Sequence, residues 1–432
     1  MFLFTNTRTY GKILSNGSKD FFQNQGGTIR LYPIFSDNAF CAYKGELRRA
    51  MLINKEDFLK KNFSPESEYF ALAERAYDIL MENIYPADGG YLWSPYRCLT
   101  PGSNKFRGIW NWDSAFHAIA LSRWDTELSK ESILGFMKFQ KADGMLPDVI
   151  RENGEIVDAY SKPPVFAWAS KILYDRGADE KFLHEVYPKL AANARWWEEN
   201  RCYNGLFYYD SADKDNEKYL LHVQYETGWD NSPRWDAPAN EYWAIDLNCF
   251  MLLCYRALSE IAKILQVASD ASEWARKGEV LTERINEKLW CKEKRHYSDA
   301  NRFTERISDT LSPASFMPLY AGIASSKQAE AMEKIAENNF RSMMPTVSFD
   351  NPSFSNDYWR GPTWLNVAYF AAKGLKNYGF PVADRIKKSI LDMCKNDEGG
   401  IYENYDSLTM KGQYCNRFGW SCVFILEFLL NF

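Results

Sequence analysis

The sequence predicts an all-α protein of about twelve helices arranged as an (α/α)6 barrel, or toroid, preceded by a short β-containing segment. After residue 63, apolar residues recur at i, i+3 and i+4 in one segment after another. Segments that are apolar on every side alternate with amphipathic, charged ones, as inner and outer helices of a two-layer barrel do. The chain has no fixed repeat of the kind that open helical arrays use, which favours a closed barrel.

Residues 1–62 differ from the rest of the chain. Short aromatic and β-branched pieces, such as GTIRLYPIF and NAFCAYKG, lie between Gly, Asn and Asp turns, so we expect strands or extended chain there. This segment is too short for a robust core of its own, and we expect it to pack on residues 63–432, the catalytic barrel. Ser64, Pro65 and Glu66 indicate the first helix start of the barrel.

The helical segments that follow alternate in character up to the C-terminus. An amphipathic helix belongs on the outside of a barrel, and an apolar one on the inside. The predicted helices lie within residues 67–84, 110–124, 128–142, 163–177, 179–200, 244–265, 270–290, 312–323, 326–338, 361–379, 381–395 and 419–430.

Composition limits the classes of partner. The 432 residues are 46% hydrophobic and 25% charged, as in a globular protein with a large core. The net charge of −5, without basic runs, argues against nucleic acid. Aromatic residues reach 16%, which suits either a large aromatic core or stacking on sugar rings. No apolar run is long enough to span a membrane, so we expect no membrane partner.

Cysteine and histidine patterns predict no cofactor and no catalytic metal. The nine cysteines lack CxxC spacing and are expected to be reduced, which favours a cytoplasmic location. The N-terminus does not have the pattern of a signal peptide. The four histidines show no metal-binding spacing, and no nucleotide-binding motif is present.

Aromatic and polar residues gather in four clusters, each at or just before the start of an apolar helix: residues 107–118, 228–236, 356–366 and 399–413. Brought together at one end of a barrel, they could surround a polyhydroxylated ligand, because carboxylates bind hydroxyl groups and rings stack on C–H faces. A pair of carboxylates for acid and base catalysis is the chemistry of glycoside cleavage.

Asp230 is the candidate general acid. It lies within residues 226–243, where two prolines and the Asn231-Ser232 pair predict an ordered loop. Shielding by Trp229 and Trp235 would favour its neutral form, which can protonate a leaving oxygen. The alternative for Asp230 is an Asx-turn residue that caps the following turn.

Several motifs together resemble a known family. WNWDSAFHA, GWDNSPRWD, DLNCF, YWRGPTW and ENYD occur in the order found in inverting α-glycosidases of glycoside hydrolase family 63, with similar patterns in family 37 trehalases. The resemblance implies an (α/α)6 barrel, inversion, a general-acid Asp in the GWD motif and a general-base Glu before the YD, which correspond to Asp230 and Glu403. In lacking a large N-terminal β-domain, the chain is similar to the compact branch that hydrolyses mannosylglycerate and glucosylglycerate.

The remaining candidates line the expected pocket. Glu403 follows Gly399 and Gly400 in a predicted loop, where a solvated surface Glu is the alternative and Glu398 and Asp406 compete for the role of base. The residues expected to bind substrate are Trp112, Asp113, Asp148, Trp229, Tyr358, Trp359, Arg360 and Trp364.

Other interpretations exist for some of these side chains. Asp113 could simply cap its helix, and Arg360 could pair with a catalytic carboxylate. Asp148 is a weaker candidate, as is Lys162. We expect His117 to be a hydrogen-bonded core residue, and Asp246 and Asn248 to form structural hydrogen bonds.

The sequence thus predicts an exo-acting, α-glucosidase-like inverting enzyme whose partner is a small carbohydrate. A trehalase, or a carbohydrate-binding protein without activity on the same barrel, is the alternative. A glycerate-bearing substrate would need a cation, for which the sequence offers Arg107, Arg234, Arg360 and Arg417.

Overall fold

The computed structural model describes residues 22–25, 28–31, 54–85, 95–102 and 105–432. The chain divides into two units, residues 1–61 and 62–432, which are described separately.

The first unit contains the expected strands and one helix. Strand β1 (Phe22–Gln25) pairs antiparallel with β2 (Thr28–Leu31), inside the segment predicted to be extended. Residues 54–62 are helical, however, so the prediction of extended chain was wrong at this end. Phe58 and Leu59 are buried among charged residues of good helix propensity, a local pattern that favours a helix. The NAFCAYKG piece lies outside the described residues.

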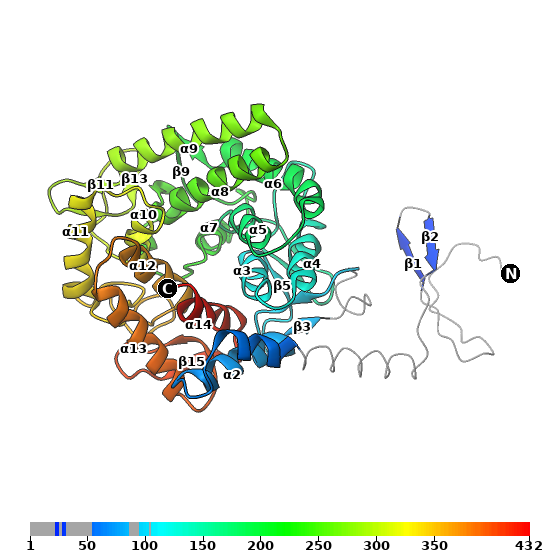
Figure 1. The fold of residues 1–432 in the computed structure, drawn as a ribbon. Helices are drawn as coiled ribbons and strands as arrows, with labels where there is room; N and C mark the ends of the chain where they lie inside the picture. Colours follow the sequence, from blue (N-terminus) through cyan, green and yellow to red (C-terminus); the bar gives the residue numbers. More distant parts are fainter. Residues whose placement is uncertain (1–21, 26–27, 32–53, 86–94, 103–104) are drawn as a thin grey trace. The chain divides into compact units, whose positions relative to one another are not determined.

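The second unit is an (α/α)6 barrel, which confirms the predicted fold class (Figure 1). In the described part of the chain, six inner helices form a closed ring in which each contacts the next: α3, α5, α8, α10, α12, α14 and again α3. The inner helices are α3 (Asn111–Leu121), α5 (Phe166–Asp175), α8 (Ile245–Ile264), α10 (Met317–Tyr320), α12 (Leu365–Asn377) and α14 (Gly419–Leu430). The outer helices are α2 (Phe70–Glu82), α4 (Thr126–Met137), α6 (Glu180–Asn200), α9 (Ala268–Lys288), α11 (Ser326–Ile335) and α13 (Val382–Asn396).

The burial pattern of each helix follows its sequence. Every residue of α3 is buried, because this inner helix has neighbours on all sides. Outer helix α9 buries one stripe at the spacing of three and four residues: Ala271, Trp274, Gly278, Leu281 and Ile285. The core therefore lies between the two layers and along the axis of the inner ring.

Inner helix α10 is only one turn long and continues from the 3-10 turn η3 (Pro313–Phe316). Its partner α12 approaches closely at Gly374, where a Cβ would lie 2.7 Å from the backbone nitrogen of Tyr320. The absence of a side chain at Gly374 is what allows this contact.

Helix α2 begins at Phe70 rather than at Ser64, so the predicted helix start was wrong. The hydroxyls of Ser64 and Ser67 accept hydrogen bonds from the backbone nitrogens of Glu66 and Tyr69. These side-chain turns compete with the helix for the backbone and delay its first turn.

Short antiparallel strand pairs, which the helical periodicity did not reveal, lie in the connections of the barrel. Strands β5 (Gly108–Trp110), β6 (Val149–Arg151) and β7 (Ile156–Val157) form a three-stranded sheet. The two-stranded pairs are β3 (Ile84–Tyr85) with β4 (Cys98–Leu99), β8 (Cys202–Tyr203) with β9 (Leu206–Phe207), β10 (Tyr242–Trp243) with β13 (Ala300–Asn301), β11 (Trp290–Cys291) with β12 (His296–Tyr297), and β14 (Tyr402–Tyr405) with β15 (Gly412–Asn416).

The four aromatic–polar clusters precede or open inner helices α3, α8, α12 and α14, as predicted. The eight cysteines within the described ranges are free: Cys98, Cys202, Cys249, Cys254, Cys291, Cys394, Cys415 and Cys422. Across the described residues, no helix has the length and hydropathy needed to cross a bilayer.

Candidate active site

The loop that carries Asp230 is fixed by a glycine and a serine. Helix α7 (Tyr219–Thr227) ends at Gly228, whose φ of 71° lies in the left-handed region. A Cβ on Gly228 would overlap the Trp112 ring, so only glycine fits here. Ser232 then accepts a hydrogen bond from Arg234 and starts the 3-10 turn η1 (Pro233–Trp235). The capping residue of this loop is Ser232, so the alternative interpretation of Asp230 as the cap was wrong.

The Asp230 carboxyl receives no hydrogen bond from a neighbouring residue that would stabilise its charge. Among the other described residues, none donates to its oxygens or forms an ion pair with them. Burial raises the pKa of Asp230; attraction by Lys162 opposes this, repulsion by Asp148 adds to it, and the residue's own backbone N–H opposes it slightly. The environment therefore favours the neutral acid.

Glu403 lies on strand β14, paired with β15, so the prediction of a loop position was wrong. Its side chain is only 1% exposed. The Tyr358 hydroxyl donates to Oε1 over 2.8 Å, and the Cys415 backbone nitrogen donates to Oε2 over 3.2 Å. Burial raises the pKa of Glu403, and both hydrogen bonds counteract that rise. Such donors stabilise a carboxylate that acts as an acceptor.

The two competitors of Glu403 have other surroundings. Glu398 is exposed. Asp406 accepts hydrogen bonds from the backbone nitrogens of Leu408 and Thr409 over 2.8 and 3.1 Å, which makes it a turn-forming residue. Asp406 is buried as Glu403 is, but its second carboxyl oxygen accepts a hydrogen bond from the Asn356 side chain over 2.9 Å.

Asp113 and Asp148 come together from neighbouring segments. Asp113 lies in the first turn of α3, and Asp148 immediately precedes β6; the Asn111 nitrogen donates to the Asp148 carbonyl over 2.9 Å. Lys162 forms an ion pair of 3.0 Å with Asp148. Burial and repulsion from Asp148 raise the pKa of Asp113 to about 8, so Asp113 carries a proton at neutral pH.

These four carboxyl groups form one electrostatic cluster. Repulsion from Asp230 raises the pKa of Glu403, and Glu403 in turn contributes to the raised pKa of Asp113. Repulsion from Asp148 likewise raises the pKa of Asp230. Four segments of the chain therefore place their carboxyl groups close enough to shift one another's pKa.

The predicted aromatic residues pack against one another beside the carboxyl groups. Trp359 and Trp364 stack with ring centroids 3.8 Å apart, and Trp229 lies 5.0 Å from Trp359. Trp420, which was not predicted as a site residue, lies 5.4 Å from both Trp112 and Trp364. These rings are almost fully buried, so they mainly form a rigid base for the loops.

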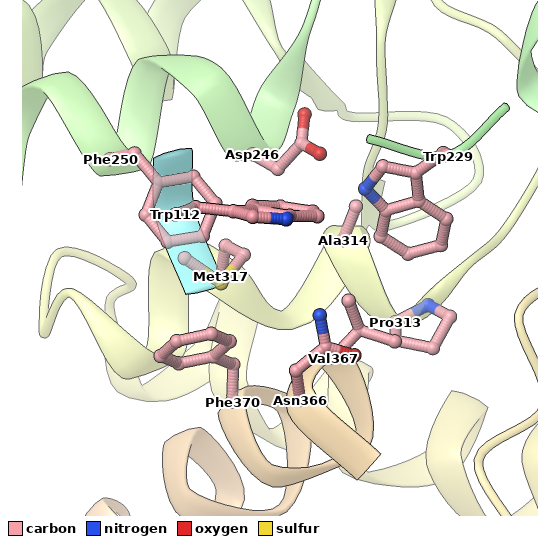
Figure 2. Close-up of a pocket in the computed structure, with 10 residues that line it drawn as sticks. All are labelled: Trp112, Trp229, Asp246, Phe250, Pro313, Ala314, Met317, Asn366, Val367 and Phe370. Carbon is pink, nitrogen blue, oxygen red and sulfur yellow. The ribbon is translucent and has the colours of Figure 1, made fainter. Parts of the chain in front are cut away.

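A small cavity of about 10 Å³, room for about one water molecule, lies in the barrel interior and shares Trp112 and Trp229 with this aromatic layer. Figure 2 shows the two indole rings on one side and Asn366 and Phe370 on the other. The Asn366 amide has no hydrogen-bond partner among the described residues. The remaining lining is mostly apolar.

Arg360 pairs with neither candidate catalytic carboxyl, Asp230 or Glu403, so that alternative was wrong. Its guanidinium binds Asp236 over 2.7 Å and the Asn231 carbonyl over 3.0 Å. The Asn231 side-chain oxygen accepts a hydrogen bond from the backbone nitrogen of Trp359 over 2.9 Å. Arg360 thus joins the 228–236 loop to the 356–366 loop at their exposed edge.

The other three arginines considered for an anionic ligand are also paired. Arg107 binds Glu152 over 2.9 Å, and Arg417 binds Glu82. Arg234 is fully buried and forms bidentate pairs of 2.8 Å with two aspartates, Asp246 and Asp299. Arg234 is thus fully used inside the protein, whereas Arg107 and Arg417 form pairs that are partly exposed.

The remaining sequence predictions had mixed outcomes. Asp246 and Asn248 form structural bonds as expected, the latter with both backbone groups of Phe207 over 2.9 Å. His117 is buried as expected, but neither ring nitrogen has a partner in the described structure. Tyr160 and Tyr225 surround Lys162 and were missed, because no motif marked their segments.

Comparison with known proteins shows the family of the chain. The mannosylglycerate hydrolase MGH1-like glycoside hydrolase domain model matches residues 107–421. The mannosylglycerate hydrolase of Thermus thermophilus is 25% identical over 410 residues, which cover 76% of this chain and 95% of that protein.

Two further matches agree with this family. A crystal structure of the Thermus thermophilus family 63 mannosylglycerate hydrolase with glucose has a TM-score of 0.69 at 25% identity, covering 83% of this chain and 99% of that one. The periplasmic trehalase of Salmonella paratyphi C is 24% identical, over 66% of this chain and 57% of the trehalase. Since the domain model spans well over half of the sequence, this chain belongs to the mannosylglycerate hydrolase-like family of glycoside hydrolases.

Proposed function

We propose that this enzyme removes a terminal α-linked sugar from a small glycoside with inversion, with Asp230 as general acid and Glu403 as general base. The observation that carries the proposal is the unequal environment of the two carboxyls. Asp230 lacks donors from neighbouring residues and favours its neutral form, whereas Glu403 accepts hydrogen bonds from Tyr358 and Cys415. A pair of carboxyls with such different surroundings is the arrangement that separates acid from base.

The reaction follows from these two protonation states. Asp230 gives its proton to the glycosidic oxygen as the bond from that oxygen to the anomeric carbon breaks. Glu403 takes a proton from a water molecule, whose oxygen attacks the anomeric carbon from the opposite face. The α-linked sugar is released as the β-anomer, and the exchange of protons with solvent resets both carboxyls.

Asp113 and Asp148 bind the hydroxyl groups of the reacting sugar in this proposal. Asp113 carries a proton near neutral pH and can donate, whereas Asp148 is paired with Lys162 and accepts. The tryptophans Trp112, Trp229, Trp359 and Trp364, together with Tyr358, hold the loops that present these groups. Arg360 fixes the loop edge through its pair with Asp236.

For the substrate we propose an α-mannoside or α-glucoside of glycerate. The similarity to mannosylglycerate hydrolases over nearly their whole length supports this class. Trehalose is the second candidate, supported by the similarity to a periplasmic trehalase.

The test is a panel of mannosylglycerate, glucosylglycerate, trehalose and maltose, with products followed by proton NMR. We expect turnover of a glycerate-bearing member and early appearance of the β-anomer. Early release of the α-anomer would contradict inversion. Turnover of trehalose alone would replace the substrate class and leave the acid and base unchanged.

A further inference from the structure

We propose that Lys162 is a positioning residue of the acid–base machinery, whose buried ammonium group holds Asp148 in place and tunes the general acid Asp230. The inference rests on the proposed role of Asp230. It assigns a function to a segment, Ser161 to Pro164, that the proposed reaction does not use directly.

The ammonium group of Lys162 is held by three contacts. It forms the 3.0 Å ion pair with Asp148, donates to the carbonyl of Tyr225, and lies 5.2 Å from the centre of the Tyr160 ring. Tyr225 belongs to α7, the helix that leads directly into the Asp230 loop. The side chain is 8% exposed, so its position is fixed by protein contacts.

Lys162 is surrounded by more negative than positive groups. Asp113 faces it from α3, Asp148 from the start of β6, Asp230 from the loop after α7, and Tyr160 from its own connection. Glu403 on β14 completes the carboxyl cluster through its effects on Asp113.

Other cations near the cluster are already used or lie outside it. Arg151, which attracts Asp148 from the end of β6, is exposed and pairs with Glu155 over 3.6 Å. Lys105 is exposed and acts on Glu403. In the described part of the molecule, Lys162 is therefore the buried cation that faces the acid and its neighbours.

These contacts set the direction of the effect. The attraction of Lys162 lowers the pKa of Asp230 by more than the repulsion of Asp148 raises it. Loss of the Lys162 charge therefore raises the pKa of Asp230, whether or not Asp148 takes up a proton in response. Loss of the Asp148 charge alone lowers it. Because the general acid works in its protonated form, the alkaline limb of kcat/KM follows this pKa.

The experiment compares Lys162→Met, Lys162→Arg and Asp148→Asn with Lys105→Met as the matched control. The readout is the pH profile of kcat/KM on the glycoside turned over fastest in the panel. We expect the alkaline limb of kcat/KM to move to higher pH by about one pH unit in Lys162→Met and to lower pH in Asp148→Asn. In Lys162→Arg it should lie at the wild-type pH. Lys105→Met should leave the alkaline limb unchanged and move only the acidic limb, to higher pH.

A second readout does not require turnover. Carbon-13 NMR of labelled aspartate carboxyls, with the Asp230 signal assigned by Asp230→Asn, follows the same pKa directly. If Asp230→Asn remains fully active, the proposed general acid is wrong; an unmoved Asp230 titration in a folded Lys162→Met variant would overturn the role of Lys162. Should Lys162→Met fail to fold, an alkaline limb that stays or rises in Asp148→Asn would overturn that role equally.

Discussion

The two proposed catalytic carboxyls lie on segments of the chain that are built differently. Asp230 lies on an irregular loop after Gly228, and no donor from another described residue reaches its oxygens. Glu403 lies on a paired strand, with one donor on each carboxyl oxygen. Burial raises the pKa of both. Hydrogen-bond donors, and not burial alone, therefore distinguish the proposed base from the proposed acid.

Removing either carboxyl should have the largest effect. We expect Asp230→Asn and Glu403→Gln each to lower kcat on the preferred glycoside on the order of 10²- to 10⁴-fold, the usual contribution of a general acid or base. Glu398→Gln, an exposed carboxyl near the same hairpin, is the matched control and should keep the wild-type rate. Steady-state kinetics at the optimal pH measures all three, and full activity in either catalytic variant would reject that residue.

The second largest effect is expected from a substitution of Gly228 in the loop that carries Asp230. Gly228→Ala forces a Cβ against the Trp112 ring at a left-handed φ, whereas Gly322→Ala has a similar φ of 66° and no atom within 4 Å of the new Cβ. We expect about 1–2 kcal/mol of destabilisation from the backbone in both variants. Overpacking should add about 1–3 kcal/mol in Gly228→Ala alone. Urea denaturation measures the free energy of unfolding of both variants. Equal decreases would show that the Trp112 ring moves aside without cost.

Removal of one hydrogen-bond donor to Glu403 tests how the surroundings of the proposed base set its pKa. Tyr358→Phe deletes the hydrogen bond that lowers the pKa of Glu403, so that pKa rises. Because the base works when ionised, activity should be lost at a higher pH as the pH falls, with the acidic limb of kcat/KM shifted up by about one unit.

Tyr414→Phe is the control for this variant. Its ring centroid lies 4.8 Å from that of Tyr358, but its hydroxyl is directed to Asp357 over 3.4 Å and not to Glu403. The acidic limb should stay in place. A shift as large as that of Tyr358→Phe would mean that the pKa of Glu403 depends on the polarity of its surroundings and not on the specific hydrogen bond from Tyr358.

The smallest effect is expected at the edge that joins the two loops. Arg360→Met breaks a partly exposed pair with Asp236, which we expect to contribute less than about 1 kcal/mol. KM should rise slightly with kcat nearly unchanged, and added salt should reduce the difference from wild type. A large loss of kcat in Arg360→Met would place this residue closer to the reacting groups than the structure does.

The parts of the molecule that sequence could predict are those governed by local chemistry. Helical periodicity predicted the two layers, since α3 and α14 are largely apolar and buried over most or all of their length, whereas α9 buries a single stripe. Two prolines and the Asn231-Ser232 pair marked the Asp230 loop for the same reason, because these residues favour turns through local chemistry.

The parts that sequence missed depend on distant partners. The hairpin that carries Glu403 has the strands YENY and GQYCN, which lack a clear apolar alternation. Tyr358 lies 45 residues from Glu403 in sequence, and no local pattern connects them. The pairing of Arg360 with Asp236 rather than with a catalytic group is likewise a property of two loops meeting in space.

The most direct test of the acid–base assignment replaces the leaving group. An α-glycosyl fluoride of the preferred sugar releases fluoride without protonation, so the reaction no longer needs a general acid but still needs a base. We predict that Asp230→Asn recovers most of the wild-type rate on the fluoride, while Glu403→Gln stays inactive. Equal losses for both variants on the fluoride, or recovery by Glu403→Gln, would contradict the assignment.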